Sequence, residues 1–505
     1  MNSRILMLAV AACLAAPASS HAQTIPHQSG QRNSIGSGIG QSEMPRGAFF
    51  EPRVEAAAQY VNNINLAQDG QDQVDTFGLE LAPGFYASYS TGAVLAAIDY
   101  SLIGRAWEDS DYNDVSHRLN ANGEWRALPE WFSVSGQASY SDAVIDPRNG
   151  LNYGGLGIFG SGNMQEVAAV GVTPQFQHRF KDVLATAQYS YGRTWYLDEG
   201  KGQPTVGFVS NQDSTDQGAN FRIGSAESDA RLTAAVFYDW QKSEFDTALP
   251  YEFERAGLDL EAQLARTLRF VGDVGKESDL DASSTQGGLD SDFWSAGLRW
   301  QPNERSSVEG TYGERFFGSS YSARITHKAR LLEFNASYSE EPTVETRMLS
   351  LGEFDPGQLP PGSPNVDFGR FNSSPFIARN ANAGVTATGS RTTVSLTAYQ
   401  YQRDFIRGLR QDEDGLGVTF GATRQFASNL SGDFSLSYND YERSAEPIDE
   451  VVLPTSNDSD VQAIFRLNRE AGSKLTISGE MGYLTRSGDS DFDGWWLAMR
   501  ARWTP

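Results

Sequence analysis

The sequence predicts an all-β protein, a transmembrane antiparallel up-and-down β-barrel of about 22 strands, within a range of about 20 to 24, in an outer membrane. Three observations predict this fold class. Polar and apolar residues alternate strictly in many short segments, short and long links between these segments alternate along the chain, and the N-terminus has the pattern of an export signal.

The alternation is clearest between residues 132 and 140, where even positions are apolar or small and odd positions carry Ser or Gln. Residues 183–191, 332–338, 430–438 and 475–483 repeat the pattern. Side chains of a strand point to opposite faces with a period of two, so one face of each segment suits lipid and the other suits water. A secreted soluble sandwich or β-helix is the rival interpretation, because a sheet with one wet face also alternates.

The links give the second regularity. Short links, which we expect on the periplasmic side, lie near residues 90–92, 128–130, 180–182, 266–269, 302–305, 327–330, 389–391, 426–429 and 470–474. Long links, which we expect outside the cell, lie near residues 62–75, 109–114, 147–163, 198–216, 278–291, 342–375, 404–414, 445–460 and 488–493. Outer-membrane barrels combine short periplasmic turns with longer extracellular loops.

The N-terminus predicts three regions. Residues 1–22 have Arg4, an apolar run and a small-residue end, the pattern of a cleaved signal peptide. Residues 23–48 are rich in Gly, Ser and Gln and predict a flexible periplasmic tail, and residues 49–505 predict the barrel. Cys13, the only cysteine, lies in the signal, where a shorter lipoprotein signal ending before it is the alternative.

Charge and hydropathy exclude several classes of protein. The net charge of −24 becomes −25 when Arg4 leaves with the signal, and such an acidic chain is a poor partner for nucleic acid. No later stretch is long and apolar enough for a membrane helix, so spanning requires a closed barrel. We therefore expect export through the inner membrane and insertion into the outer membrane of a Gram-negative bacterium.

Charged residues at inward-facing positions predict a hydrated lumen, because charge is costly against lipid. The lumen-lining candidates are Arg255, Asp259, Glu261, Arg299, Glu333, Asp433, Arg466, Glu480, Arg500 and Arg502. Inward-facing aromatic residues that could stack on sugars are Tyr399, Tyr401 and Trp496. The link at residues 342–375 is the best candidate for a constriction folded into the lumen, with an exposed surface loop as the alternative.

A search for catalytic groups predicts no enzyme and no cofactor. Histidine is scarce after the signal, and no Gly-x-Ser-x-Gly motif is present. Asp489, Asp491 and Asp493 copy the start of a calcium loop, but Arg500 stands where the loop needs glutamate, so they are only a weak metal candidate.

Two partners are expected besides membrane lipid, which are the outer-membrane assembly machinery and lipopolysaccharide. The last strand, ending at Trp503, is similar to the terminal strand that the outer-membrane assembly machinery reads. Acidic runs in the predicted outer loops suggest either contact with lipopolysaccharide through divalent cations or an electrostatic field that disfavours anions.

A family resemblance adds a functional expectation. It is carried by residues 53–67, which contain Tyr60-Val61-Asn62-Asn63-Ile64, and then by Glu80-Leu81-Ala82-Pro83-Gly84-Phe85. Leu119-Asn120-Ala121-Asn122, Trp131-Phe132-Ser133 and residues 142–147 continue it. In these segments the chain resembles the outer-membrane proteins associated with the exosortase/PEP-CTERM system. The resemblance implies a channel or scaffold associated with exopolysaccharide biosynthesis and export, with exopolysaccharide and its export proteins as partners. A general or substrate-specific porin for small-solute uptake is the alternative, and an outer-membrane hydrolase is a third class.

Overall fold

The computed structural model describes residues 46–68, 70–144, 164–197, 213–226, 230–246, 250–279, 290–351, 375–406, 411–445, 455–489 and 491–505. Its strands in the first half are β1 (Gly47–Val61), β2 (Thr76–Ser90), β3 (Val94–Trp107), β4 (Asp114–Leu128), β5 (Phe132–Val144), β6 (Met164–Phe180), β7 (Val183–Tyr196), β8 (Ser214–Ser225), β9 (Leu232–Phe245), β10 (Tyr251–Ala265) and β11 (Leu268–Asp279). The second half adds β12 (Asp290–Asn303), β13 (Ser306–Arg315), β14 (Gly318–Lys328), β15 (Leu332–Thr343), β16 (Phe376–Thr388), β17 (Thr392–Phe405), β18 (Gln411–Ala427), β19 (Leu430–Ala445), β20 (Ser456–Glu470), β21 (Leu475–Gly488) and β22 (Phe492–Trp503).

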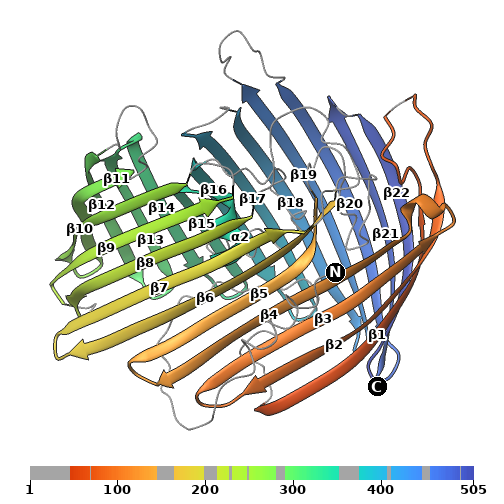
Figure 1. Ribbon diagram of the computed structural model, residues 1–505, viewed down its shortest axis with the longest axis horizontal. Coiled ribbons are helices and arrows are strands. Elements are labelled where there is room, and N and C mark those ends of the chain that lie inside the picture. Colours follow the sequence, from red (N-terminus) through yellow and green to blue (C-terminus); the bar gives the residue numbers. More distant parts are fainter. Residues whose placement is uncertain are drawn as a thin grey trace.

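The 22 strands form one closed sheet, which confirms the predicted fold class. Each strand pairs antiparallel with the next along the chain, and β1 pairs antiparallel with β22 from Val54↔Trp503 to Val61↔Trp496. This last pairing leaves no free sheet edge, so every strand satisfies its backbone hydrogen bonds within the barrel. Figure 1 shows the resulting wall curving around a wide interior.

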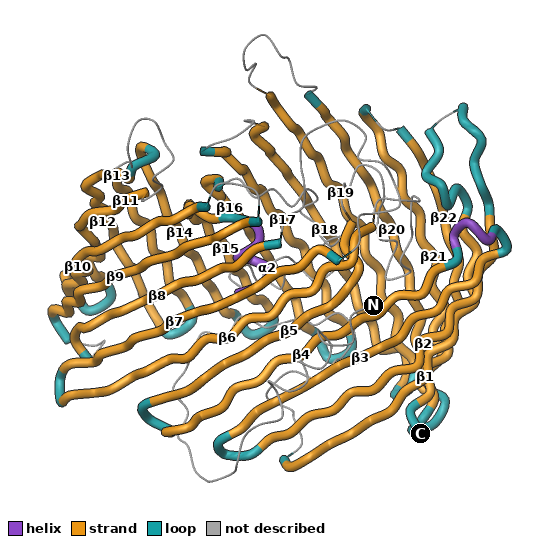
Figure 2. Tube along the Cα trace, in the orientation of Figure 1, coloured by secondary structure: helices purple, strands orange, loops and turns teal. Residues whose placement is uncertain are grey.

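The links follow the expected order with two exceptions, which are the links between β13 and β14 and between β21 and β22. The link between β21 and β22 is predicted to be long, but it has only three residues because β22 already begins at Phe492. Most turns between an even-numbered strand and the next are tight, as between β18 and β19, and the C-terminal end of β22 lies at the same rim (Figure 2). Sequence inspection missed the links at residues 226–231 and 246–250. It also missed the link between β13 and β14, where only Phe316 and Phe317 stand on the side predicted for long loops. Gly318 follows at φ +107, a backbone conformation that favours glycine, so this turn can be short.

The two faces of the wall differ as the alternation predicts. On β22, Trp495, Leu497 and Met499 are exposed on the outer face, whereas Trp496 and Ala498 are buried on the inner face. The same contrast recurs on β12, where Trp294, Leu298 and Trp300 are exposed and Phe293 is buried. Large apolar side chains on the outside of a closed sheet are stable only against lipid, so the outer face is the membrane-facing surface.

This assignment of faces gives a test on two adjacent residues at the centre of β14. Ala323 is exposed on the outer face and Ser322 is exposed on the lumen face. We expect Ala323→Arg to lower the free energy of unfolding in lipid vesicles by about 2–4 kcal/mol, because it places a charge near the bilayer midplane. Ser322→Arg at the same depth is the matched control and should change it by less than about 1 kcal/mol. Equal effects in urea titrations would mean that the faces are assigned wrongly.

Two short helices accompany the strands within the described residues. The 3-10 helix η2 (Ser110–Tyr112) lies in the link between β3 and β4, and the α-helix α2 (Glu345–Leu351) follows β15. Figure 1 shows α2 inside the barrel, behind the wall formed by β5 to β8. Across the described part of the chain, neither helix has the length and apolar character needed to cross a bilayer.

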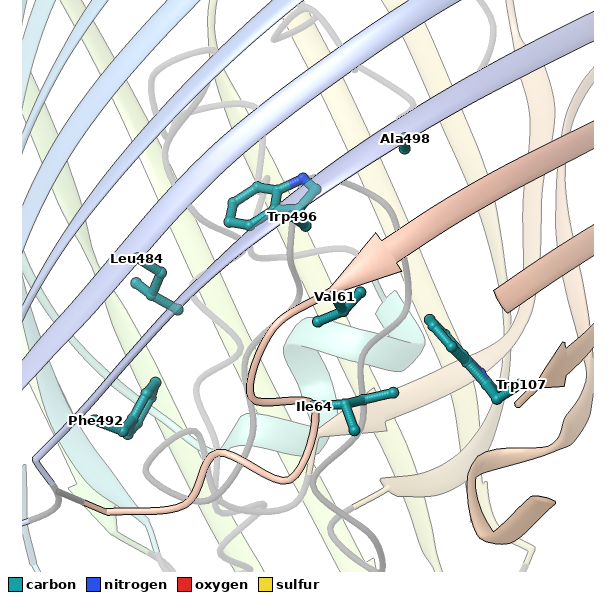
Figure 3. Close-up of a cluster of buried hydrophobic side chains, with 7 residues drawn as sticks. All are labelled: Val61, Ile64, Trp107, Leu484, Phe492, Trp496 and Ala498. Atoms are coloured by element: carbon teal, nitrogen blue, oxygen red, sulfur yellow. The ribbon is translucent and has the colours of Figure 1, made fainter. Parts of the chain in front are cut away.

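An apolar cluster fills part of the interior beside the β1–β22 closure. Figure 3 shows its members, which are Val61, Ile64, Trp107, Leu484, Phe492, Trp496 and Ala498. Ile64 belongs to the link between β1 and β2 and is completely buried, so this link turns inward to cover the ends of neighbouring strands. The lumen is therefore not uniformly wet.

The start of the barrel lies close to the predicted boundary. β1 begins at Gly47, and the described residues begin at Arg46, two or three positions before the expected barrel start at residue 49. The predicted signal at residues 1–22 and most of the predicted tail at residues 23–48 lie outside the described residues.

Candidate functional site

The candidate site is the barrel lumen, and its wall carries the ten charged residues predicted for it. By strand register they lie on the inner face: Arg255, Asp259 and Glu261 on β10, Arg299 on β12, Glu333 on β15, Asp433 on β19, Arg466 on β20, Glu480 on β21, and Arg500 and Arg502 on β22. Neighbouring strands place residues of opposite charge side by side on this face. The structure therefore brings the predicted residues together in pairs and not in one cluster.

Most of these charges are paired along the wall. The pairs are Arg255 with Asp273, Asp259 with Arg222, Glu261 with Arg269 (2.8 Å) and Arg299 (2.9 Å), Glu333 with Lys328 (2.9 Å), Arg466 with Glu480 (2.5 Å) and Arg500 with Glu55 (3.6 Å). Asp433 instead accepts hydrogen bonds from Thr423 Oγ1 (2.9 Å) and Asn468 Nδ2 (2.8 Å). Partly exposed pairs add little stability individually, but together they make this wall polar and nearly neutral.

The end of β15 and the segment after it contact the inside of the opposite wall. Pro342 O accepts a hydrogen bond from Gln241 Nε2 on β9 (3.2 Å), and α2 then packs against β8, β7, β6 and β5. At the far end of α2, Ser350 O accepts a hydrogen bond from Gln137 Nε2 on β5 (2.9 Å). The described beginning of the link at residues 342–375 is thus folded inward, and residues 352–374 of this link lie outside the described residues.

Asp216 on β8 anchors α2. Its carboxylate is completely buried and accepts hydrogen bonds from the hydroxyls of Ser214 (3.1 Å) and Ser243 (2.6 Å) on the wall. Thr346 Oγ1 (3.1 Å) and Ser350 Oγ (2.9 Å) donate from α2. A buried carboxylate needs such donors, because an unpaired buried charge is strongly unfavourable.

Sequence reasoning missed this anchor. It placed Asp216 at the end of a long loop, whereas β8 already begins at Ser214. Thr346 and Ser350 stand four residues apart, a spacing that puts both hydroxyls on one face of a helix. This spacing was the available signal for two donors on one helix face. It does not identify their acceptor, which lies about 130 positions away in sequence.

A lumen cavity of about 670 Å³ lies between α2 and the facing wall. It is bounded by β7 to β10 on one side and by β15 to β17 on the other, with Thr343 and Arg347 from the inward segment between them. The inward-facing side-chain amides at its lining are those of Gln188, Asn220, Gln241, Asn380 and Asn382. Its charged lining residues are Arg255, Arg315, Arg347, Asp239 and Glu341. This volume is within the range of about 300–1,000 Å³ that small-ligand pockets occupy.

Two of the three predicted sugar-stacking residues line this cavity. Tyr399 and Tyr401 point inward from β17 with their rings parallel, at an interplanar angle of 8° and a centroid separation of 6.5 Å. Each ring lies over a glycine of the neighbouring strand, Tyr399 over Gly417 and Tyr401 over Gly415. Tyr399 is only 4% exposed, so Tyr401, which is half-buried, is the ring with an accessible surface.

The prediction that Trp496 stacks on a sugar is wrong. Trp496 points inward as the alternation indicates, but it is completely buried in the apolar cluster of Figure 3, and its Nε1 donates to Glu480 Oε1 (2.9 Å). With both faces covered, it cannot stack on a sugar. Its position in the cluster depends on the link between β1 and β2, whose inward fold a strand pattern does not reveal.

The structure also corrects the weak metal candidate formed by Asp489, Asp491 and Asp493. Asp489 and Asp491 accept backbone hydrogen bonds from Asn457 N (3.2 Å) and Gly488 N (2.6 Å), and β22 has begun by Asp493. Their carboxylates therefore shape the turn between β21 and β22. Within the described ranges, no three carboxylate, histidine or cysteine groups gather closely enough to hold a metal ion.

The histidines in the described part of the chain are dispersed. His117 lies on the outer face, where its Nδ1 contacts the hydroxyl of Tyr100 (2.8 Å). His178 packs against Trp131, and His327 contacts Ser306 Oγ (2.9 Å). These two histidines lie near the ends of β6 and β14, at the rim with the short turns. They do not form one site.

Comparison with known proteins finds similar folds only. No protein-family model and no curated protein matches the chain. Among solved structures, the siderophore receptor PirA from Acinetobacter baumannii is 9% identical with a TM-score of 0.49, covering 91% of this chain and 81% of that chain. The FrpB iron transporter from Neisseria meningitidis is 9% identical with a TM-score of 0.49, covering 90% and 81%. A loop-deletion mutant of OmpT, an outer membrane protein of Vibrio cholerae, is 11% identical with a TM-score of 0.30, covering 91% and 100%.

The architecture itself defines the class of protein. An even number of antiparallel strands closed into one barrel, with an apolar outer face and a polar inner face, is the construction of outer-membrane proteins. This chain is an outer-membrane β-barrel whose lumen is partly occupied by its own inward-folded segment.

Proposed function

We propose that this barrel is a non-enzymatic channel or scaffold associated with exopolysaccharide biosynthesis and export. The observation that carries the proposal is the lumen cavity beside α2, where amide side chains and a tyrosine ring face a polar interior. Amides donate and accept hydrogen bonds at once, which suits a chain of sugar hydroxyls. The resemblance of residues 60–64 and 80–85 to exosortase-associated barrels supports the same function.

Deleting the gene tests this proposal directly. We expect surface exopolysaccharide to fall severalfold and to return when the wild-type gene is supplied on a plasmid. Total polysaccharide in the periplasm should rise in the deletion strain if the barrel is a conduit. Unchanged surface polysaccharide would refute the association with export.

Two single-cysteine variants distinguish a conduit from a scaffold. Cys13 lies in the predicted signal, so a cysteine introduced into the mature chain would be the only thiol. Thr397→Cys places it on the lumen face of β17, and Leu396→Cys places it on the lipid face one residue away. A bulky maleimide added to cells should reduce export only for Thr397→Cys if sugar passes through the lumen. Labelling without any effect on export would leave the scaffold role.

A porin for small solutes is the second candidate. The nearly neutral, ion-paired wall favours it, because paired charges neither attract nor repel one class of solute. Planar-bilayer recordings should then show steady open conductance. Steady conductance together with normal surface polysaccharide in the deletion strain would establish the porin and reject the export function.

A further inference from the structure

The lumen cavity has hydrogen-bonding capacity that the protein itself leaves unused. Arg315 on β13 is only 8% exposed, and its Nε and Nη1 atoms donate to Glu277 (3.1 Å) and Glu341 (3.1 Å). Its Nη2 atom is buried and finds no acceptor among the residues that the structure describes. A buried guanidinium donor without an acceptor is costly, so an oxygen atom that reaches this donor from the cavity would be bound favourably.

A second guanidinium at the cavity has the same property. Arg255 on β10 pairs with Asp273 and lies over the ring of Phe293 with its Cζ atom 4.1 Å from the ring centroid. Its Nε atom is also buried without an acceptor among the described residues. Because each arginine already has a carboxylate partner, the unused donors do not require an anion and suit hydroxyl or ring oxygens.

The facing wall supplies the complementary features. Tyr401 presents a half-buried ring that rests on Gly415, with the guanidinium of Arg403 5.7 Å from the ring centroid. Asn380 and Asn382 stand beside it on β16, in register with Tyr401 and Tyr399 respectively. One flat aromatic surface with amides at its edge is complementary to the apolar face and hydroxyl rim of a pyranose ring.

We propose that this cavity is a binding site for a short segment of neutral oligosaccharide. One sugar ring of the segment lies on Tyr401, and oxygen atoms of the segment accept hydrogen bonds from Arg315 Nη2. The choice of ligand class rests on the proposed export function. The site itself is defined by the donors, the amides and the ring, so binding can be measured without reference to export.

The test uses the full-length mature barrel, purified in detergent, and isothermal titration with four probes. Maltohexaose and cellohexaose are the neutral sugars, hexagalacturonate is the anionic sugar, and a polyethylene glycol of similar length is the control without sugar rings. We expect at least one neutral hexasaccharide to bind and the glycol not to bind. Binding of hexagalacturonate alone, binding of the glycol as well, or no binding of either neutral sugar would overturn the proposal.

Three variants locate the binding. Tyr401→Leu removes the ring, and Arg315→Lys keeps the charge but removes the Nη2 donor, so each should weaken binding about tenfold. Tyr438→Leu, on the outer face of β19, is the matched control and should bind like the wild type. Heat-modifiable migration on gels would establish that each variant is folded. Wild-type affinity in folded Tyr401→Leu and Arg315→Lys would contradict the assignment.

These results are separable from those of the gene deletion. Loss of export in the deletion strain with no sugar binding at this cavity would remove the site and leave the export function. Sugar binding with normal export in the deletion strain would keep the site and reject the function.

Discussion

Replacing Asp216 by alanine is expected to release α2 from the barrel wall and to increase the conductance of the lumen severalfold. A helix of seven residues is not stable by itself, so α2 depends on its contacts with the wall. Asp216 accepts from Thr346 and Ser350, and hydrogen bonds to a charged group contribute about 1.5–3 kcal/mol each. Losing both shifts the equilibrium of α2 by about 3 kcal/mol, roughly a hundredfold.

Planar-bilayer recordings of the purified barrel would measure this effect. The double variant Thr346→Val, Ser350→Ala removes the donors from α2 while leaving Asp216 with Ser214 and Ser243, so it should raise conductance similarly. Asp433→Ala is the matched control, because this lumen carboxylate lies on β19 and accepts hydrogen bonds from Thr423 and Asn468, not from α2. Wild-type conductance in folded Asp216→Ala would show that α2 does not obstruct the lumen.

The fold could be predicted because its main determinant is local. A strand buried on one face shows its orientation at every second residue, so the alternation at residues 132–140 identifies both a strand and its lipid face without any distant information. The number of strands follows from counting such segments. Antiparallel neighbours then need only the connecting links, and these are visible in the same sequence.

The site could be predicted only in part because it depends on distant contacts. Alternation identifies Tyr399 and Tyr401 as inward residues, but whether an inward residue meets water or protein depends on what else folds into the lumen. Trp496 follows the same alternation and is nevertheless buried, because Ile64 from another link packs in the same cluster. Asp216 likewise gains its role only when α2 arrives from β15.

The two-residue link between β13 and β14 escaped prediction for a different reason. Its residues Phe316 and Phe317 are apolar, so the hydrophobic pattern runs through the turn without a break. Phe316 packs against Phe253, and its backbone N–H donates to Glu277 Oε1 (2.7 Å). Neighbouring strands thus stabilise this turn, and the usual polar turn residues are not needed.

The second large effect is expected at the closure of the barrel, where Gly482 on β21 lies beneath the indole of Trp496. A Cβ atom added at Gly482 would approach Trp496 Cζ2 to 2.0 Å, far inside van der Waals contact. The ring cannot move easily, because it is enclosed by the apolar cluster of Figure 3 and bonded to Glu480. Gly482→Ala should therefore lower the free energy of unfolding by about 1–3 kcal/mol, the usual cost of overpacking.

Three further variants show whether the clash is the cause. Gly479→Ala on the same strand adds the same methyl group where no atom lies within 4 Å, so its stability should stay within about 0.5 kcal/mol of the wild type. Trp496→Ala leaves a cavity and destabilises the barrel by itself, but Gly482→Ala should cost almost nothing more in that background. Urea unfolding in lipid vesicles gives the free energies of the wild type and of the four variants. Additive losses in the double variant would mean that glycine is required at position 482 for its backbone and not for the space that Trp496 occupies.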